Sequence, residues 1–60
     1  MRKLRKYVCK YDTGHAYGDF EFYSEYRKGS TNNRIDCLAE MWKRFKKYYK
    51  IIDIYLIESY

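Results

Sequence analysis

The sequence of 60 residues has no proline and only three glycines, two cysteines and one histidine. No stretch approaches the roughly 18 apolar residues that a membrane-spanning helix needs. The basic residues at 1–6 are not followed by the apolar region of a secretory signal. These absences predict a cytoplasmic protein without membrane contact.

The short chain restricts what the protein can be. We expect one domain covering residues 1–60, which excludes an enzyme built from a cofactor domain and a substrate domain. Only about 60 % of the surface of the unfolded chain is buried at this size, so a lone core is marginally stable. Such chains usually need a cross-link or a second subunit.

Few residues can carry catalysis or bind a metal. Cys9 and Cys37 are expected to be free thiols, with a disulfide between them as the alternative. A C-x-x-C pair is absent and His15 is the only histidine, so neither a metal site nor a cofactor is predicted. His15 lies in a glycine-flanked loop without a nucleophile to activate. The tripeptide at 12–14 matches that of aspartic proteases, but those enzymes need a dyad built from two much larger halves. The sequence therefore predicts a non-catalytic protein.

Hydrophobic periodicity predicts four elements. Alternating residues indicate strands at about 4–11, 20–27 and 51–58, and a loop with two glycines and two aspartates joins the first two. A period of 3.6 predicts an amphipathic helix at about 33–49, capped by Ser30 or Asn33. Its apolar stripe is expected to contain Ile35, Leu38, Met41, Trp42, Phe45 and Tyr49.

The order ββαβ predicts an α+β fold with a three-stranded antiparallel sheet, order 2-1-3, and the helix packed on one face. The face under the helix should carry Tyr7, Cys9, Tyr11, Phe20, Phe22, Ile52, Ile54 and Leu56. The other face, called the back face here, mixes charges with apolar groups, and the isoleucine-rich third strand forms an open edge. Both features favour a homodimer with Val8, Tyr55 and Ile57 at its interface, although scattered exposed apolar side chains are also normal.

The formal net charge of +5 is unevenly distributed. Residues 1–10 and residues 43–50 each carry five basic side chains and no acidic one, whereas 11–42 and 51–60 are net acidic. Because the first strand and the helix run in the same direction, the two basic clusters should lie at opposite ends of the domain. The candidate binding residues are Lys6, Lys10, Tyr23 and Tyr55 on the back face, Lys43, Lys46, Lys47 and Lys50 from the second cluster, and Tyr17 in the loop.

The chain has the layout of a hairpin, the turn Tyr26–Ser30, an amphipathic helix and an isoleucine-rich last strand. This layout resembles small proteins encoded by phages and prophages of Gram-positive bacteria. More narrowly, the layout is similar to the dimeric uracil-DNA glycosylase inhibitors of Bacillus phages, which share the ββαβ order and an aromatic-basic-glycine turn. This resemblance implies a stoichiometric, non-catalytic protein that dimerises and blocks a host factor.

Two functions follow as expectations. The first is a homodimeric phage-type binding protein that inhibits a host protein of defence or DNA metabolism. The alternative is a DNA- or RNA-binding protein that uses the lysine and arginine clusters and the sheet-face tyrosines. Salt distinguishes them, because nucleic-acid binding weakens steeply and linearly with log salt concentration.

Overall fold

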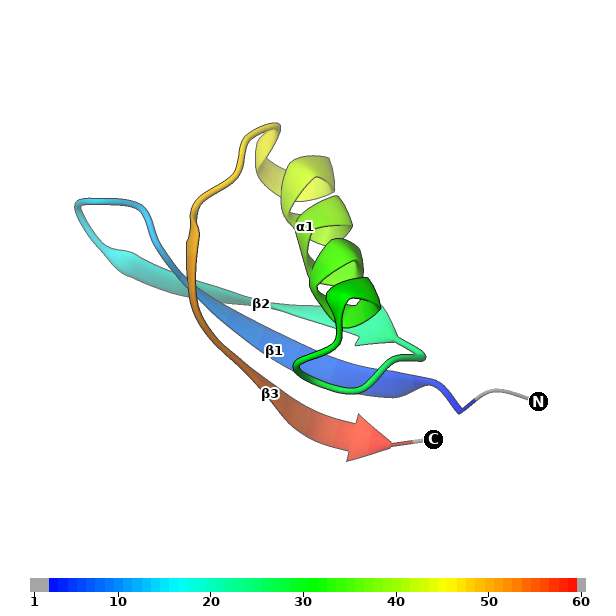
Figure 1. The fold of residues 1–60 in the computed structure, drawn as a ribbon. Coiled ribbons are helices and arrows are strands. Elements are labelled where there is room, and N and C mark those ends of the chain that lie inside the picture. The colour runs from blue at the N-terminus through cyan, green and yellow to red at the C-terminus, as the bar shows by residue number, and fades with distance from the viewer. Residues whose placement is uncertain (1–2, 60) are drawn as a thin grey trace.

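The fold is an open sheet covered by one helix. A computed structural model describes residues 3–59, which form in order strand β1 (Arg5–Asp12), strand β2 (Tyr17–Ser24), helix α1 (Thr31–Phe45) and strand β3 (Lys50–Ser59). The strands make one antiparallel sheet in the order β2-β1-β3, and α1 lies across one face (Figure 1). This arrangement confirms the predicted α+β fold, its ββαβ order and its sheet order.

The hairpin between β1 and β2 is longer than predicted. β2 begins at Tyr17 rather than at residue 20, because Gly18 and Asp19 continue the pairing with β1. The turn is reduced to residues 13–16, where the Gly14 N–H donates to the Asp12 carboxylate at 2.8 Å. Gly18 also leaves room for the ring of Tyr11, since a Cβ at this position would lie 2.6 Å from that ring.

Helix α1 spans 31–45 instead of the predicted 33–49, and its caps explain both ends. Ser30 is the N-cap, and its Oγ accepts the Asn33 N–H at 3.1 Å. Lys46 adopts a left-handed conformation with φ of 58° and donates its N–H to the Trp42 carbonyl at 2.8 Å. This conformation ends the helix, as glycine commonly does at the same position in other proteins.

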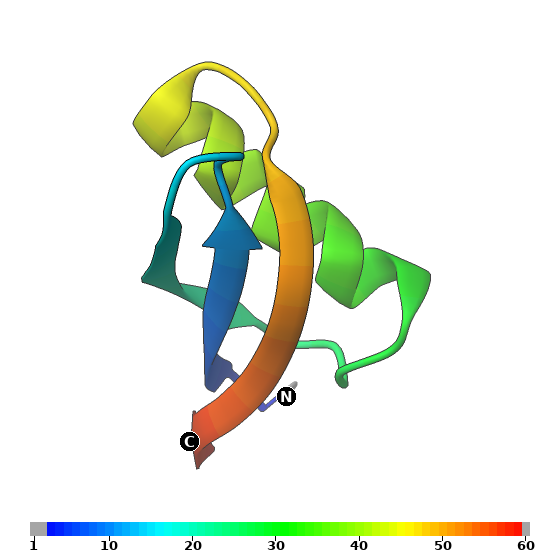
Figure 2. The same cartoon turned by 90° about the vertical axis from the view of Figure 1, so that its left-hand side faces the viewer.

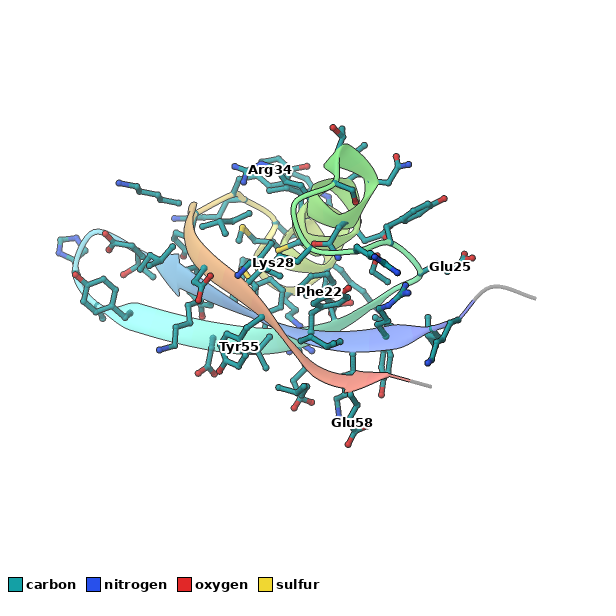
Figure 3. The ribbon with its side chains drawn as sticks, turned by 60° about the horizontal axis from the view of Figure 1, so that its bottom comes forward. Phe22, Glu25, Lys28, Arg34, Tyr55 and Glu58 are labelled. Carbon is teal, nitrogen blue, oxygen red and sulfur yellow. The ribbon has the colours of Figure 1, made fainter. Side chains whose placement is uncertain are left out.

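The core lies between α1 and the sheet. Its buried residues are Tyr7, Cys9, Phe20 and Phe22 from β1 and β2, Cys37 and Met41 from α1, and Ile54 from β3. Phe22 is seen between sheet and helix in Figure 3. Two residues of the expected helix stripe, Ile35 and Trp42, are instead about half exposed. The reason is that the buried face of α1 runs through Asn33, Cys37 and Met41.

Strand β3 is two residues longer than β1 because it contains two bulges. At the first bulge, Lys10 pairs with Asp53 and Tyr11 pairs with Ile51, so Ile52 is an extra residue. Ile57 is the extra residue of the second bulge, between the partners of Tyr7 and Lys6. The bulge turns Ile51 toward the core and leaves Ile52 48 % exposed. Leu56, opposite Tyr7, is 50 % exposed because α1 packs mainly on β2, away from β3. The expectation that Ile52 and Leu56 are core residues is therefore wrong. Figure 2 shows β3 curving along the open side of the sheet.

Candidate functional site

The back-face lysines lie among carboxylates. Lys6 Nζ is 3.1 Å from Glu21 Oε1, and this hydrogen bond raises the pKa of the Lys6 ammonium. Lys10 lies opposite Asp19 on β2 and opposite Asp53 on β3. The sequence placed both lysines on this face and predicted that charges and apolar groups mix there, and the register shows which acidic residues lie next to each lysine. The back face consequently does not form a basic surface.

The back-face tyrosines lie on either side of β1. Tyr23 pairs with Lys6, whose Nζ is 5.9 Å from the centre of the ring. Tyr55 pairs with Val8, and both tyrosines are exposed. Val8 is only 8 % exposed, so it is already covered within one chain. Of the residues expected at a dimer interface, Tyr55 and Ile57 have the larger accessible surface.

The end of α1 presents aromatic and basic side chains together. We call Trp42, Lys43, Lys46, Lys47 and Tyr48 the helix-end patch; all five residues are exposed. The turn at Lys46 brings Tyr48 back against Trp42, with ring centres 5.6 Å apart. These two aromatic side chains are 47 % and 61 % exposed. The patch therefore offers two flat apolar surfaces beside three positive charges.

Neither Trp42 nor Tyr48 is among the candidate binding residues expected from the sequence, although the lysine-rich helix that contains Trp42 is suited to docking. The helical period placed Trp42 in the buried stripe, and Tyr48 was assigned no role. The sequence signal for their exposure was the run of lysines around them, because several neighbouring lysines are unusual next to a packed core. Tyr49, expected in the same stripe, does pack against the core, but from the loop after α1.

Lys50 lies apart from Lys43, Lys46 and Lys47 of the second basic cluster. It begins β3 and, with Lys10 and Tyr17, lines an open hollow of about 760 Å³ near the hairpin. Asp12 and Asp19 line the same hollow, so its charges are mixed. The candidate binding residues thus divide among the back face, this hollow and the helix-end patch. Tyr17 is strongly exposed beside the turn, as expected for an accessible side chain there.

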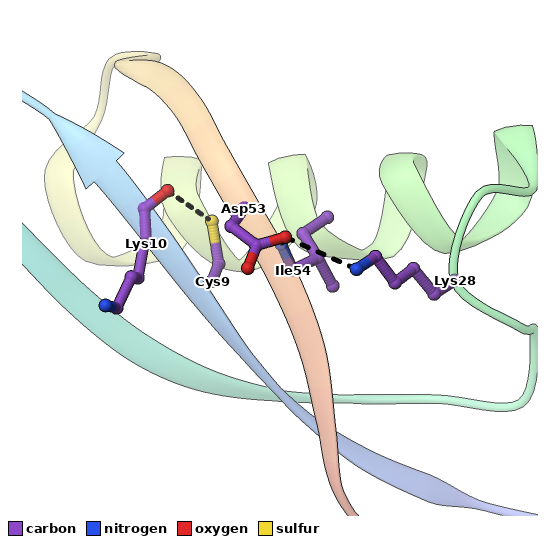
Figure 4. A network of polar contacts seen from close by, with 5 residues as sticks. All are labelled: Cys9, Lys10, Lys28, Asp53 and Ile54. Atoms are coloured by element: carbon purple, nitrogen blue, oxygen red, sulfur yellow. Dashed lines mark hydrogen bonds and ion pairs between the residues drawn. The ribbon is translucent and has the colours of Figure 1, made fainter.

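A polar clip lies on β3, the open strand (Figure 4). Asp53 Oδ1 accepts a hydrogen bond from the Ile54 N–H at 2.9 Å and is 3.3 Å from Lys28 Nζ. Lys28 comes from the loop before α1, so the clip ties this loop to the sheet. It occupies the Ile54 N–H of an edge strand, which within residues 3–59 pairs with β1 alone.

A groove of about 350 Å³ lies between β3 and the first turn of α1. Ile51, Ile52 and Ile54 line it on the strand side, and Lys28 and Arg34 line it on the helix side. Asn33, which is almost fully buried, also lines the groove; within residues 3–59 its Oδ1 has no hydrogen-bond partner. This groove could not be predicted from the sequence, because the bulge that brings both Ile51 and Ile52 to its strand side is not marked in the chain.

Cys9 and Cys37 are buried free thiols in contact with each other. The Cys9 Sγ lies 3.7 Å from the Lys10 carbonyl, which accepts its hydrogen bond. The hydrogen bond between Cys37 and Cys9, together with burial, raises the pKa of the Cys37 thiol far above the ordinary value. The same hydrogen bond lowers the pKa of Cys9.

The other residues considered for chemistry have local roles or lie apart. Asp12 holds the hairpin turn, and His15 is exposed within that turn. In the part of the chain that the structure describes, no three His, Cys, Asp or Glu side chains gather as metal ligands. Across residues 3–59, α1 is the only helix, and it is too short and too polar to span a bilayer.

Comparisons of the chain with protein families, curated proteins and solved structures found no match.

Proposed function

We propose that the protein is a small, non-catalytic binding protein that acts stoichiometrically on another macromolecule. The favoured target is a host protein of defence or DNA metabolism, inhibited when the phage-type protein covers an acidic part of its surface. The observation that supports this proposal is the helix-end patch, where Trp42 and Tyr48 are exposed beside three lysines. Tryptophan and tyrosine are frequent anchors of protein interfaces. Neighbouring positive charges speed the encounter with an acidic partner.

The test is capture of a target from nuclease-treated host lysate, followed by a titration with the purified target. Trp42 is the only tryptophan, so its fluorescence directly reports binding at the patch. We expect its emission to shift to shorter wavelength as the target excludes water from the indole. Replacing Trp42 or Tyr48 by alanine should weaken binding by about 2 kcal/mol or more, as at interface hot spots.

Ile35→Ala is the matched control, because Ile35 is also an exposed apolar residue of α1 but lies at its other end. The assignment of the target to the patch would be contradicted if both aromatic variants bound as tightly as the wild type. It would also be contradicted if only the Ile35 variant lost binding.

A second candidate function is direct binding of single-stranded DNA or RNA. The same ring pair could stack on bases while Lys43, Lys46 and Lys47 contact phosphates. A titration with oligothymidine, followed by Trp42 fluorescence at several salt concentrations, tests this reading. Quenching whose affinity falls linearly with log salt supports nucleic acid. Absence of binding at low salt removes this candidate.

A further inference from the structure

The groove between β3 and the first turn of α1 is positively charged on its helix side. Lys28 and Arg34 line it there, and no carboxylate of residues 3–59 is among its lining groups. Lys28 Nζ is 3.3 Å from the Asp53 carboxylate, whereas Arg34 is exposed and forms no ion pair within the same residues. Both cationic residues are labelled in Figure 3. The charge of Arg34 is therefore free to meet an anion in the groove.

The first turn of α1 adds two backbone donors to this positive charge. Ser30 accepts the Asn33 N–H through its Oγ and the Arg34 N–H through its carbonyl. The N–H groups of Thr31 and Asn32 have no hydrogen-bond partner within residues 3–59, and the turn contains no acidic side chain. Free N–H groups at the start of a helix favour phosphate, because the helix dipole is positive at this end.

Asn33 is a second, independent indication that the groove holds a ligand. It is 1 % exposed and lines the groove, and its Nδ2 donates to the Tyr26 carbonyl at 3.0 Å. Its Oδ1 has no donor within residues 3–59. Nearly all buried polar atoms of folded proteins have a hydrogen-bond partner. Because an amide oxygen can only accept, it selects a ligand with an N–H or O–H group, which an anion such as sulfate lacks.

The opposite wall of the groove is apolar. Ile51, Ile52 and Ile54 of β3 line it, and Ile52 is 48 % exposed. The groove measures about 350 Å³, which is much larger than a phosphate group. Sites for small organic molecules have volumes of about 300–1,000 Å³. The ligand should therefore combine a phosphate with a flat or apolar group that packs on the isoleucines.

We propose that this groove binds a nucleoside monophosphate. The phosphate lies at the first turn of α1, on the free N–H groups there and beside Arg34. The base packs on Ile52, and an N–H or O–H group of the nucleoside donates to Asn33 Oδ1. A sugar phosphate would fit less well, because it has no apolar group for the isoleucine wall. The groove lies at the opposite end of α1 from the helix-end patch, so this proposal goes beyond the proposed function and does not depend on it.

Nuclear magnetic resonance titration with adenosine and uridine 5′-monophosphates tests the proposal. We expect saturable shifts of the backbone N–H signals of Thr31 and Asn32 and of the side-chain amide signals of Asn33. Ribose 5-phosphate lacks the base and adenosine lacks the phosphate. Each should bind about tenfold or more weakly than the nucleotide, because one of the two sets of contacts is lost.

Three variants separate the groove from the other positive surface. Arg34→Gln should weaken nucleotide binding about tenfold, because a charged donor to the phosphate is lost. Ile52→Ala should weaken nucleotide binding about threefold and leave the binding of ribose 5-phosphate unchanged. Lys43→Gln, the matched control, also removes one positive charge from α1, but in the helix-end patch, and should bind as the wild type does. Circular dichroism confirms that each variant is folded.

Three outcomes would overturn the proposal. The first is that neither nucleotide gives saturable shifts at the first turn of α1. The second is that ribose 5-phosphate binds as tightly as the nucleotides. The third is that Lys43→Gln weakens binding while Arg34→Gln does not, which would place the nucleotide on the helix-end patch. None of these outcomes affects the capture of a protein target, so the proposed function is tested separately.

Discussion

Met41 shows how one side chain joins several parts of this small core. It is fully buried, and its Sδ accepts the Tyr49 N–H at 3.1 Å. The thioether therefore fills the space under α1 and also holds the loop that follows the helix. Tyr49 in turn stacks on Tyr11 with ring centres 5.3 Å apart. Loss of this one residue should loosen both the helix and the loop.

We predict that Met41→Ala lowers the free energy of unfolding by about 2–5 kcal/mol, the usual cost of a cavity at a fully buried position. Met41→Leu keeps the volume and should cost less than about 1.5 kcal/mol, apart from the lost acceptor for Tyr49. Urea unfolding followed by far-ultraviolet circular dichroism measures both. Equal losses in the two variants would show that the sulfur contact, rather than the volume, is what matters.

The buried thiols make stability depend on alkaline pH. Above the ordinary thiol pKa of 9.0, the unfolded chain releases both protons, whereas the folded chain keeps that of Cys37 because its pKa is raised. The folded state then binds more protons, so we predict that stability falls as the pH rises above 9. The slope is at most about 1.4 kcal/mol per pH unit for one proton.

The measurement is chemical unfolding at a series of pH values between 8 and 10. Other groups also titrate in this range. The change of the free energy of unfolding with pH is therefore compared with that of a Cys9→Ala, Cys37→Ala double variant. The double variant is expected to be less stable throughout but to lose less stability as the pH rises. An identical slope in both proteins would contradict the prediction.

At the scale of elements, the kinds and order of the strands and helix could be predicted, but not their ends. Alternation and the 3.6 period come from burial of one face, and this burial is seen in Phe20, Phe22 and Met41. α1 ends at the left-handed conformation of Lys46. Such an end is usually predicted from a glycine, and this position holds a lysine instead. The bulges of β3 could not be predicted either, because Ile51 and Ile52 are chemically identical and only packing against Tyr11 distinguishes them.

The left-handed residue after α1 leads to a stabilising substitution. Lys46 has φ of 58°, a conformation that costs a non-glycine residue about 1 kcal/mol. Lys46→Gly should therefore raise the free energy of unfolding by about 0.5–1 kcal/mol and also raise the melting temperature. Thermal unfolding provides the measurement. Lys47→Gly removes the same charge at a position without positive φ and should not stabilise the fold.

At the scale of the whole molecule, the basic clusters lie where the sequence predicted them. The contacts that the individual charged side chains make could not be predicted in the same way. The basic residues at the start of β1 and at the end of α1 lie at opposite ends, because the strand and the helix run in the same direction (Figure 1). The alternation predicted that Lys6 and Lys10 share the back face with acidic residues, but it could not show that Lys6 forms an ion pair with Glu21, because the two residues belong to different strands. Nor could it show that Trp42 faces solvent, which depends on how α1 is rotated over the sheet.

If two copies associate through β3, stability should depend on protein concentration. The folded dimer is favoured over unfolded chains by mass action, so we predict a melting temperature that rises by a few degrees for each tenfold increase in concentration. Differential scanning calorimetry at several concentrations provides the measurement, and a melting temperature independent of concentration would contradict the prediction.

The pairing of the first residue of β1 with the last residue of β3 has a practical consequence. Because Arg5 lies opposite Ser59, the chain enters and leaves the sheet on the same side, away from the helix-end patch (Figure 1). A sensor surface, dye or fused reporter attached before Arg5 or after Ser59 would therefore sit at the far side of the domain. Either attachment presents Trp42 and Tyr48 outward, so immobilised protein should keep this aromatic pair available to whatever is passed over it.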